Sequence, residues 1–117
     1  MISHVVLMMP KADLSDVERQ AFIDAFEGAV RAIPAVRGVR VGRRVVFGAG
    51  YEALAPAVNY LAVIDFDDMA GLREYLEHPA HHELGAMFYR CLSTGMAWDF
   101  EVGGIESLRR SGGFFQS

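Results

Sequence analysis

The order in which hydrophobic periodicities follow one another constrains the fold of this chain more than any other sequence feature. Short apolar runs that read as strands occur at residues 2–9, 39–47, 60–66 and 97–102, and side chains along each strand alternate between its two faces. Helical spacing fills the segment after the first of these strands and the segment before the last. The order strand, helix, strand, strand, helices, strand predicts an α+β fold of ferredoxin-like type. Such a fold has a four-stranded antiparallel sheet with its helices on one face.

Local signals place the ends of the helices. Ser15 and Glu18 have the spacing of a capping box, so we expect a helix from there to about Ile33. A second helix is expected from Asp67-Asp68 through Leu76, and the His78-Pro79 step ends it, because proline cannot continue the hydrogen-bond ladder. A third helix is expected from Pro79 to about Leu92, with His78 as its cap.

The hydrophobic fraction is 52%, which is high for a monomer of 117 residues. One sheet face covered by helices leaves the other face bare. We therefore expect a second buried surface, formed by two sheets packed face to face or by an apolar pocket.

Charge and cysteine content exclude several classes of function. The formal net charge is −4, with 11 basic and 15 acidic residues, so binding to nucleic acid is not expected. No apolar stretch approaches the ~20 residues of a membrane span, and the amino terminus lacks the features of a signal peptide. A single cysteine, Cys91, favours a reducing cytoplasm.

The segment Tyr75-Leu76-Glu77-His78-Pro79-Ala80-His81 resembles the Tyr-x-x-His-Pro-x-His signature of the Dabb (stress-responsive A/B barrel) family. Other segments agree in order and spacing over residues 1–102, namely Ile2–Leu7, Ile33-Pro34, Val41-Gly42, Phe66–Asp68 and Trp98–Phe100. Residues 103–117 are expected to form a tail, with Phe114-Phe115 as a docking point.

This resemblance implies a protomer that dimerises through its sheet faces into an α+β barrel. Within the family, the chain is similar to plant polyketide cyclases that use no metal or organic cofactor. The resemblance implies that Tyr75 and His81 occupy the positions of the catalytic tyrosine and histidine of these cyclases. Their pocket histidine in the first strand becomes His4, their first-helix aromatics become Phe22 and Phe26, and a pocket phenylalanine is replaced by Leu84.

The residues themselves suit acid–base chemistry on a small hydrophobic or aromatic carbonyl substrate, in a cyclase, lyase or isomerase reaction. Neutral His81 can remove a proton next to a carbonyl, and the Tyr75 hydroxyl can donate to the developing enolate. The substrate-binding residues that we predict are His4, Val6, Met8, Phe22, Phe26, Ile64, His78, Leu84 and Phe88.

The alternative hypothesis is a non-catalytic barrel that binds a small ligand or serves in stress response. In that case His4 is a core histidine, Tyr75 a packing aromatic, and His81 a structural residue. We expect no metal, because His78 and His81 are three residues apart across a Pro-Ala step, with no paired carboxylate at ligand spacing. The family resemblance implies that no organic cofactor is used either.

Overall fold

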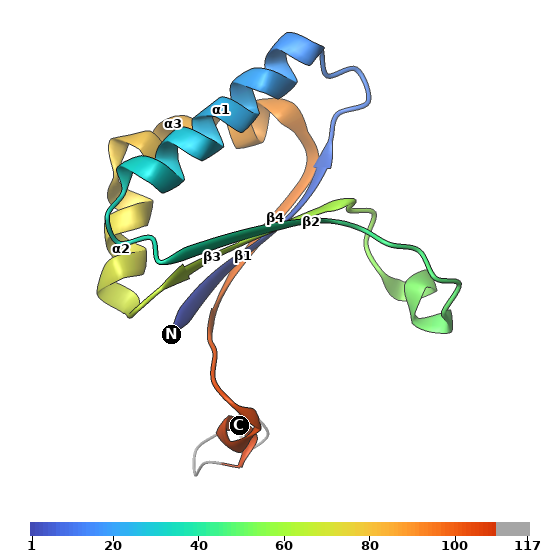
Figure 1. Ribbon diagram of the computed structural model, residues 1–117. Helices are drawn as coiled ribbons and strands as arrows, with labels where there is room; N and C mark the ends of the chain where they lie inside the picture. Colours follow the sequence, from blue (N-terminus) through green and yellow to red (C-terminus); the bar gives the residue numbers. More distant parts are fainter. Residues whose placement is uncertain (110–117) are drawn as a thin grey trace.

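A single antiparallel sheet carries three helices on one face in the computed structural model, which describes residues 1–109 (Figure 1). The strands lie in the order β2-β3-β1-β4. The predicted ferredoxin-like α+β fold is therefore confirmed. The strands are β1 (Ile2–Pro10), β2 (Gly38–Arg43), β3 (Tyr60–Phe66) and β4 (Leu92–Glu101). The helices are α1 (Asp16–Ala32), α2 (Met69–Glu77) and α3 (Pro79–Cys91).

The register of the strands decides which side chains face the helices. His4 of β1 lies opposite Ile64 of β3 and Asp99 of β4. Residues that lie opposite one another project from the same face of a sheet. The inner face, under the helices, therefore carries the even-numbered residues of β1 and β3 together with the odd-numbered residues of β4.

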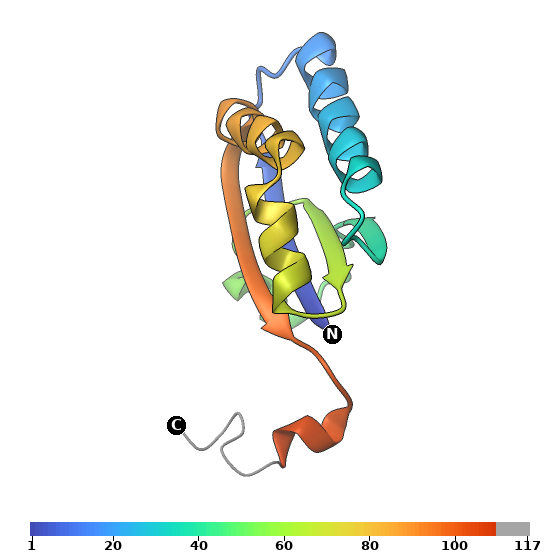
Figure 2. The same ribbon diagram turned by 90° about the vertical axis from the view of Figure 1, so that its left-hand side faces the viewer.

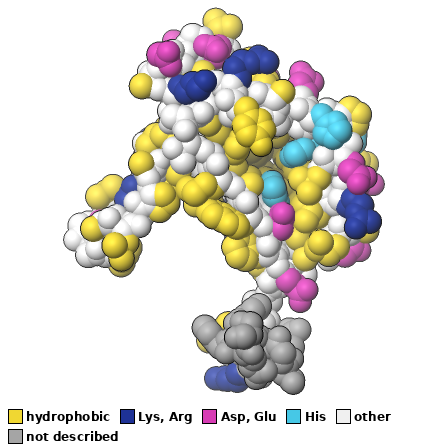
Figure 3. All heavy atoms as spheres, turned by 180° about the vertical axis from the view of Figure 1, so that it is seen from behind, with side chains coloured by type: hydrophobic (Ala, Val, Ile, Leu, Met, Phe, Trp, Pro, Cys, Tyr) yellow, Lys and Arg dark blue, Asp and Glu magenta, His cyan; other side chains and the backbone are white. Residues whose placement is uncertain are grey.

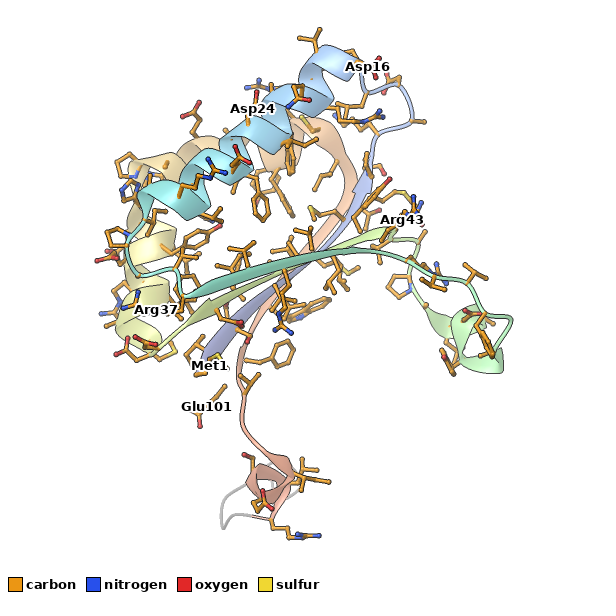
Figure 4. The ribbon with its side chains drawn as sticks, in the orientation of Figure 1. Met1, Asp16, Asp24, Arg37, Arg43 and Glu101 are labelled. Carbon is orange, nitrogen blue, oxygen red and sulfur yellow. The ribbon has the colours of Figure 1, made fainter. Side chains whose placement is uncertain are left out.

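The core lies between this inner face and the helices. Side chains of α1 and of the sheet point toward one another across that layer (Figure 4), and α2 lies against β1 and β3 (Figure 2). The buried apolar residues are Ile2, Val6, Met8, Ala29, Ile33, Ala62, Ile64, Phe66, Leu72, Tyr75, Leu84 and Cys91.

The predicted helix caps are confirmed. The Ser15 hydroxyl accepts a hydrogen bond from the Glu18 amide at 3.1 Å, and the Glu18 carboxylate accepts one from the Ser15 backbone amide. His78 ends α2 and begins α3, and its Nδ1 accepts a hydrogen bond from the Ala80 amide at 3.0 Å. The ring of His78 thus fixes the turn that presents the first residues of α3.

Two predicted strand boundaries are wrong. β2 ends at Arg43 rather than at residue 47, because residues 45–47 have no strand opposite them once the chain leaves the sheet. β4 begins at Leu92 rather than at residue 97, since its first residues pair with Leu7–Pro10 of β1. That part of β4 contains serine, threonine and glycine, which weaken the hydrophobic alternation that predicts a strand.

Two segments extend from the sheet on the side away from the helices (Figure 1). The first, which we call the arm, comprises residues 44–59 and includes the short helix η1 (Gly50–Leu54). The second follows β4 and includes η2 (Ile105–Leu108). The predicted docking point Phe114-Phe115 lies outside the described residues.

Among residues 1–109 no helix covers the outer face of the sheet, as expected (Figure 1). This face carries Val5, Leu7, Leu61, Val63, Met96, Trp98 and Phe100. Trp98 is 48% exposed and Phe100 is 50% exposed. Two large aromatic side chains on an uncovered sheet indicate a surface that is covered in the functional assembly.

Candidate active site

Tyr75 is the centre of an aromatic cluster at one end of the core. It lies in the last turns of α2 and is 1% exposed. Its ring centroid is 5.2 Å from that of Phe66, 4.7 Å from His81 and 5.9 Å from His4. The fold thus brings together three of the predicted site residues from three elements, β1, α2 and α3.

The Tyr75 hydroxyl is held in its neutral form. Burial raises the pKa of Tyr75 to about 12, because the phenolate would lose hydration. Within residues 1–109 no hydrogen bond engages this hydroxyl, yet no buried side-chain oxygen or nitrogen is left without a partner. The hydroxyl is thus not fully enclosed and is available to donate to a ligand.

His81 lies in the first turn of α3 and is half-buried. Burial lowers the pKa of His81 below its usual value, and the neighbouring His4 and His82 lower it further, while hydrogen bonding to the Leu76 backbone opposes the shift. His81 is consequently a neutral imidazole near pH 7. A neutral imidazole is the form that can accept a proton.

His4 is buried on β1 and has a carboxylate partner. Its Nδ1 lies 2.6 Å from Asp99 Oδ1 of the adjacent strand β4. A proton held on Nδ1 by this carboxylate leaves Nε2 as the acceptor. Asp99 was not among the site residues predicted from the sequence. The only sequence feature that could have indicated a role for Asp99 is its position as a carboxylate within an apolar strand. Its partner, His4, can be identified only from the register of β1 with β4.

The cluster opens at the β4 edge of the molecule. Ala97 and Asp99 of β4 are exposed although they face the helices, whereas Gly95, nearer the start of the strand, lies against Phe88 of α3. Figure 3 shows histidine side chains beside an acidic side chain on this face, bordered by hydrophobic side chains. A small molecule can therefore approach the cluster from this edge.

A separate cavity of about 840 Å³ lies between α1 and the β2 edge of the sheet. It is mainly apolar, and Met8, Phe22, Phe26, Val39, Val41 and Tyr60 line it. Val41 is 72% exposed because α1 does not extend over β2. Three arginines stand at its border, Arg19, Arg31 and Arg43, the last of them where the arm begins (Figure 4).

The predicted pocket residues divide between these two places. Met8, Phe22 and Phe26 line the cavity, whereas Tyr75 and His81 are not part of its lining. Among the remaining predicted residues, Val6, Ile64 and Leu84 are packed in the core, and Phe88 packs against Gly95. Val39, Val41 and Tyr60 were not among the pocket residues predicted from the sequence. The sequence pattern predicts that these residues belong to strands, but it does not indicate that they lie near α1.

Cluster and cavity occupy the two ends of one row of side chains. His4, Val6 and Met8 follow one another on the inner face of β1. Four residues of strand span ~13 Å, which separates His4 in the cluster from Met8 in the cavity.

Within residues 1–109 no three His, Cys, Asp or Glu side chains are arranged to hold a metal ion. In the same part of the chain no helix is long and apolar enough to cross a membrane.

Fold and site together define a ferredoxin-like α+β protein with a tyrosine–histidine cluster beneath its helices. The family model for the Stress Responsive A/B Barrel Domain matches residues 2–102. The chain belongs to this family.

Individual known proteins are similar to this chain in sequence or in fold. Olivetolic acid cyclase of Cannabis sativa is 21% identical over 87 residues, which is 74% of this chain and 82% of the cyclase. A dimeric ferredoxin-like protein of unknown function from Thermobifida fusca superimposes with a TM-score of 0.67 at 24% identity, over 86% of this chain and 90% of that one. Hydroxynitrile lyase from Passiflora edulis superimposes with a TM-score of 0.70 at 14% identity, over 87% and 93% of the two chains.

Proposed function

We propose that this protein is a cofactor-independent acid–base enzyme that acts on a small hydrophobic carbonyl compound. The observation that carries the proposal is the pairing of Tyr75 with His81, whose ring centroids are 4.7 Å apart. The tyrosine is kept protonated and the histidine is kept neutral, both by burial. One group is therefore ready to donate a proton or hydrogen bond while the other accepts a proton.

The proposed chemistry begins with removal of a proton from the carbon next to the substrate carbonyl. His81 takes the proton, and the electron pair of the broken C–H bond moves into an enolate. The Tyr75 hydroxyl donates a hydrogen bond to the enolate oxygen, where negative charge develops. His81, now protonated, returns the proton at the end of the reaction. His4, oriented by Asp99, borders the same space and is proposed to contact the substrate.

An apolar substrate fits the surroundings. The aromatic cluster offers ring faces, and the inner row of β1 connects it with the apolar cavity. The predicted substrate contacts of His78, Leu84 and Phe88 are part of this proposal. A cyclase and a hydroxynitrile lyase among the similar proteins support catalysis on this fold.

Proton exchange at a simple ketone tests the proposal. Phenylacetone in D₂O exchanges its benzylic protons slowly without a catalyst, and NMR follows the exchange. We expect the protein to accelerate it, His81→Ala to abolish the acceleration, and Tyr75→Phe to reduce it at least about tenfold. His82→Ala is the matched control, since His82 is an exposed neighbour in the same helix. If phenylacetone binds but exchanges at the buffer rate, the base assignment is wrong.

One observation favours the non-catalytic alternative. The large cavity, which would hold most of an apolar ligand, does not include Tyr75 or His81 in its lining. A binding protein needs only the cavity. Ligand binding that is lost in Phe26→Ala but unchanged in the double variant His81→Ala/Tyr75→Phe, together with exchange at the buffer rate, would identify that function.

We further propose that the protein is a homodimer joined through the outer sheet faces. The exposed Trp98 and Phe100 support this, as does the dimeric description of the Thermobifida fusca protein. Trp98 is the single tryptophan of the chain, so its fluorescence reports on this face alone. Dilution is expected to shift its emission to the red as the dimer dissociates. An emission maximum independent of concentration, together with a monomeric mass, would contradict the dimer.

A further inference from the structure

The arm, residues 44–59, has a surface that is unusual for a loop. Its large apolar side chains are almost fully exposed, with Phe47 at 87% and Leu54 at 90%. Val45, Val46 and Tyr51 are also exposed. Only two of its sixteen residues, Arg44 and Glu52, carry a charge. Loops in water are normally polar, so this surface indicates that something covers it.

The arm is nevertheless organised by its own hydrogen bonds. At its base the Arg44 amide donates to the Asn59 carbonyl at 2.7 Å. Near its tip the Glu52 carboxylate accepts from the amides of Phe47 and Gly48 at 2.7 and 2.8 Å. Gly48 has a φ of +93°, which glycine adopts without strain. A segment whose shape is fixed before it meets a partner loses little conformational entropy on binding.

The position of the arm indicates what covers it. It leaves the sheet between β2 and β3 and extends on the side away from the helices, as does the segment that follows β4 (Figure 1). The two segments therefore flank the bare outer face, where Trp98 and Phe100 are exposed. Leu61, next to the base of the arm, continues this apolar face toward it.

We propose that the arm clasps a second copy of this chain, with Phe47 and Leu54 packed on the partner while the outer sheet faces meet. The inference rests on the proposed dimer and adds to it a specific contact outside the sheet. By two-fold symmetry each protomer supplies one arm and receives one, so the contact is made twice.

A membrane is a less suitable partner for the same surface. An apolar segment that binds lipid usually has several basic residues beside it, to meet anionic headgroups. The arm has one arginine, and the whole chain has a net charge of −4. A second copy, in contrast, offers an apolar sheet face of the same character.

Sedimentation equilibrium of the full chain and of four variants tests the clasp. The double variant Phe47→Ser/Leu54→Ser removes the apolar tip of the arm, and Trp98→Asp places a charge on the outer sheet face. Val17→Ser is the matched control, because Val17 is 80% exposed but lies on α1, on the opposite side of the molecule. A Glu52→Gln variant weakens the internal brace of the arm without removing its apolar surface.

The clasp predicts that Phe47→Ser/Leu54→Ser raises the dimer dissociation constant at least about tenfold, and Glu52→Gln by a smaller factor. Val17→Ser is expected to have no effect. Phe47, Leu54, Trp98 and Val17 are exposed in the protomer, so the far-UV circular dichroism of these variants should be unchanged. If Trp98→Asp dissociates the dimer but the arm variant does not, the clasp is wrong and the sheet dimer stands. A monomeric wild-type protein overturns both. Co-sedimentation of the wild type with phosphatidylcholine or phosphatidylserine vesicles, lost in the arm variant, would replace the clasp with membrane binding.

Discussion

Replacing Tyr75 with phenylalanine should make the protein more resistant to alkaline unfolding. The folded state holds the Tyr75 pKa at about 12, against 10.0 for an exposed tyrosine. A raised pKa contributes stability that is fully present below pH 10 and is lost as the pH rises toward 12, because the unfolded chain releases its proton first. Tyr75→Phe has no proton to release and escapes this loss.

The difference of two pKa units corresponds to ~2.7 kcal/mol once both states are ionised. At pH 11, midway between the two pKa values, about 1.4 kcal/mol of it has developed. All other ionisable groups are the same in the two proteins, so their contributions cancel in the comparison. We therefore expect the wild type to lose about 1.4 kcal/mol more than Tyr75→Phe between pH 8 and pH 11.

Urea unfolding followed by circular dichroism measures this quantity at each pH. Protomer concentration is held constant because a dimer makes the midpoint depend on it, and a reductant protects Cys91. Tyr89→Phe is the control, since Tyr89 is exposed on α3 and its hydroxyl remains hydrated in the folded protein. Equal losses for the wild type and Tyr75→Phe would show that the Tyr75 hydroxyl is not desolvated. The basis for treating it as a neutral donor would then be lost.

Three further predictions follow from the geometry. A methyl group at Gly95 would lie 2.3 Å from Phe88 Cζ, so Gly95→Ala should destabilise the fold by about 1–3 kcal/mol in thermal unfolding. Most of that loss should disappear in a Phe88→Ala background, and a persistent loss would place the clash elsewhere. Ser15→Ala should cost about 1 kcal/mol in the same assay, because the Glu18 amide loses its acceptor; an unchanged midpoint would show that water replaces the cap. Phenylacetone exchange should rise with pH through a pKa below 6.5 and then level, because His81 must be neutral to act; a profile without this acidic limb would exclude His81 as the base.

The sequence alone determined the fold class, since it depends on local signals that a single segment contains. The apolar runs at residues 2–9 and 60–66, the Ser15 capping box and the proline after His78 each act over a few residues. Together they left one arrangement of strands and helices. The ends of the strands could not be predicted from these local signals. Residues 45–47 continue the apolar pattern of β2, although the pairing of β2 with β3 ends at Arg43. The polar start of β4 became a strand only by pairing with β1.

Only the tertiary structure decided how the site residues relate to one another. His4 and Asp99 are 95 positions apart, and the register of β1 with β4 is what brings their side chains within 2.6 Å. The sequence placed Tyr75 and His81 six residues apart across a helix break, but the His78 cap sets the turn that brings their rings into contact. The separation of the tyrosine–histidine cluster from the apolar cavity could not be read from the chain either. It follows from how far the helices extend over the two edges of the sheet, and packing decides that.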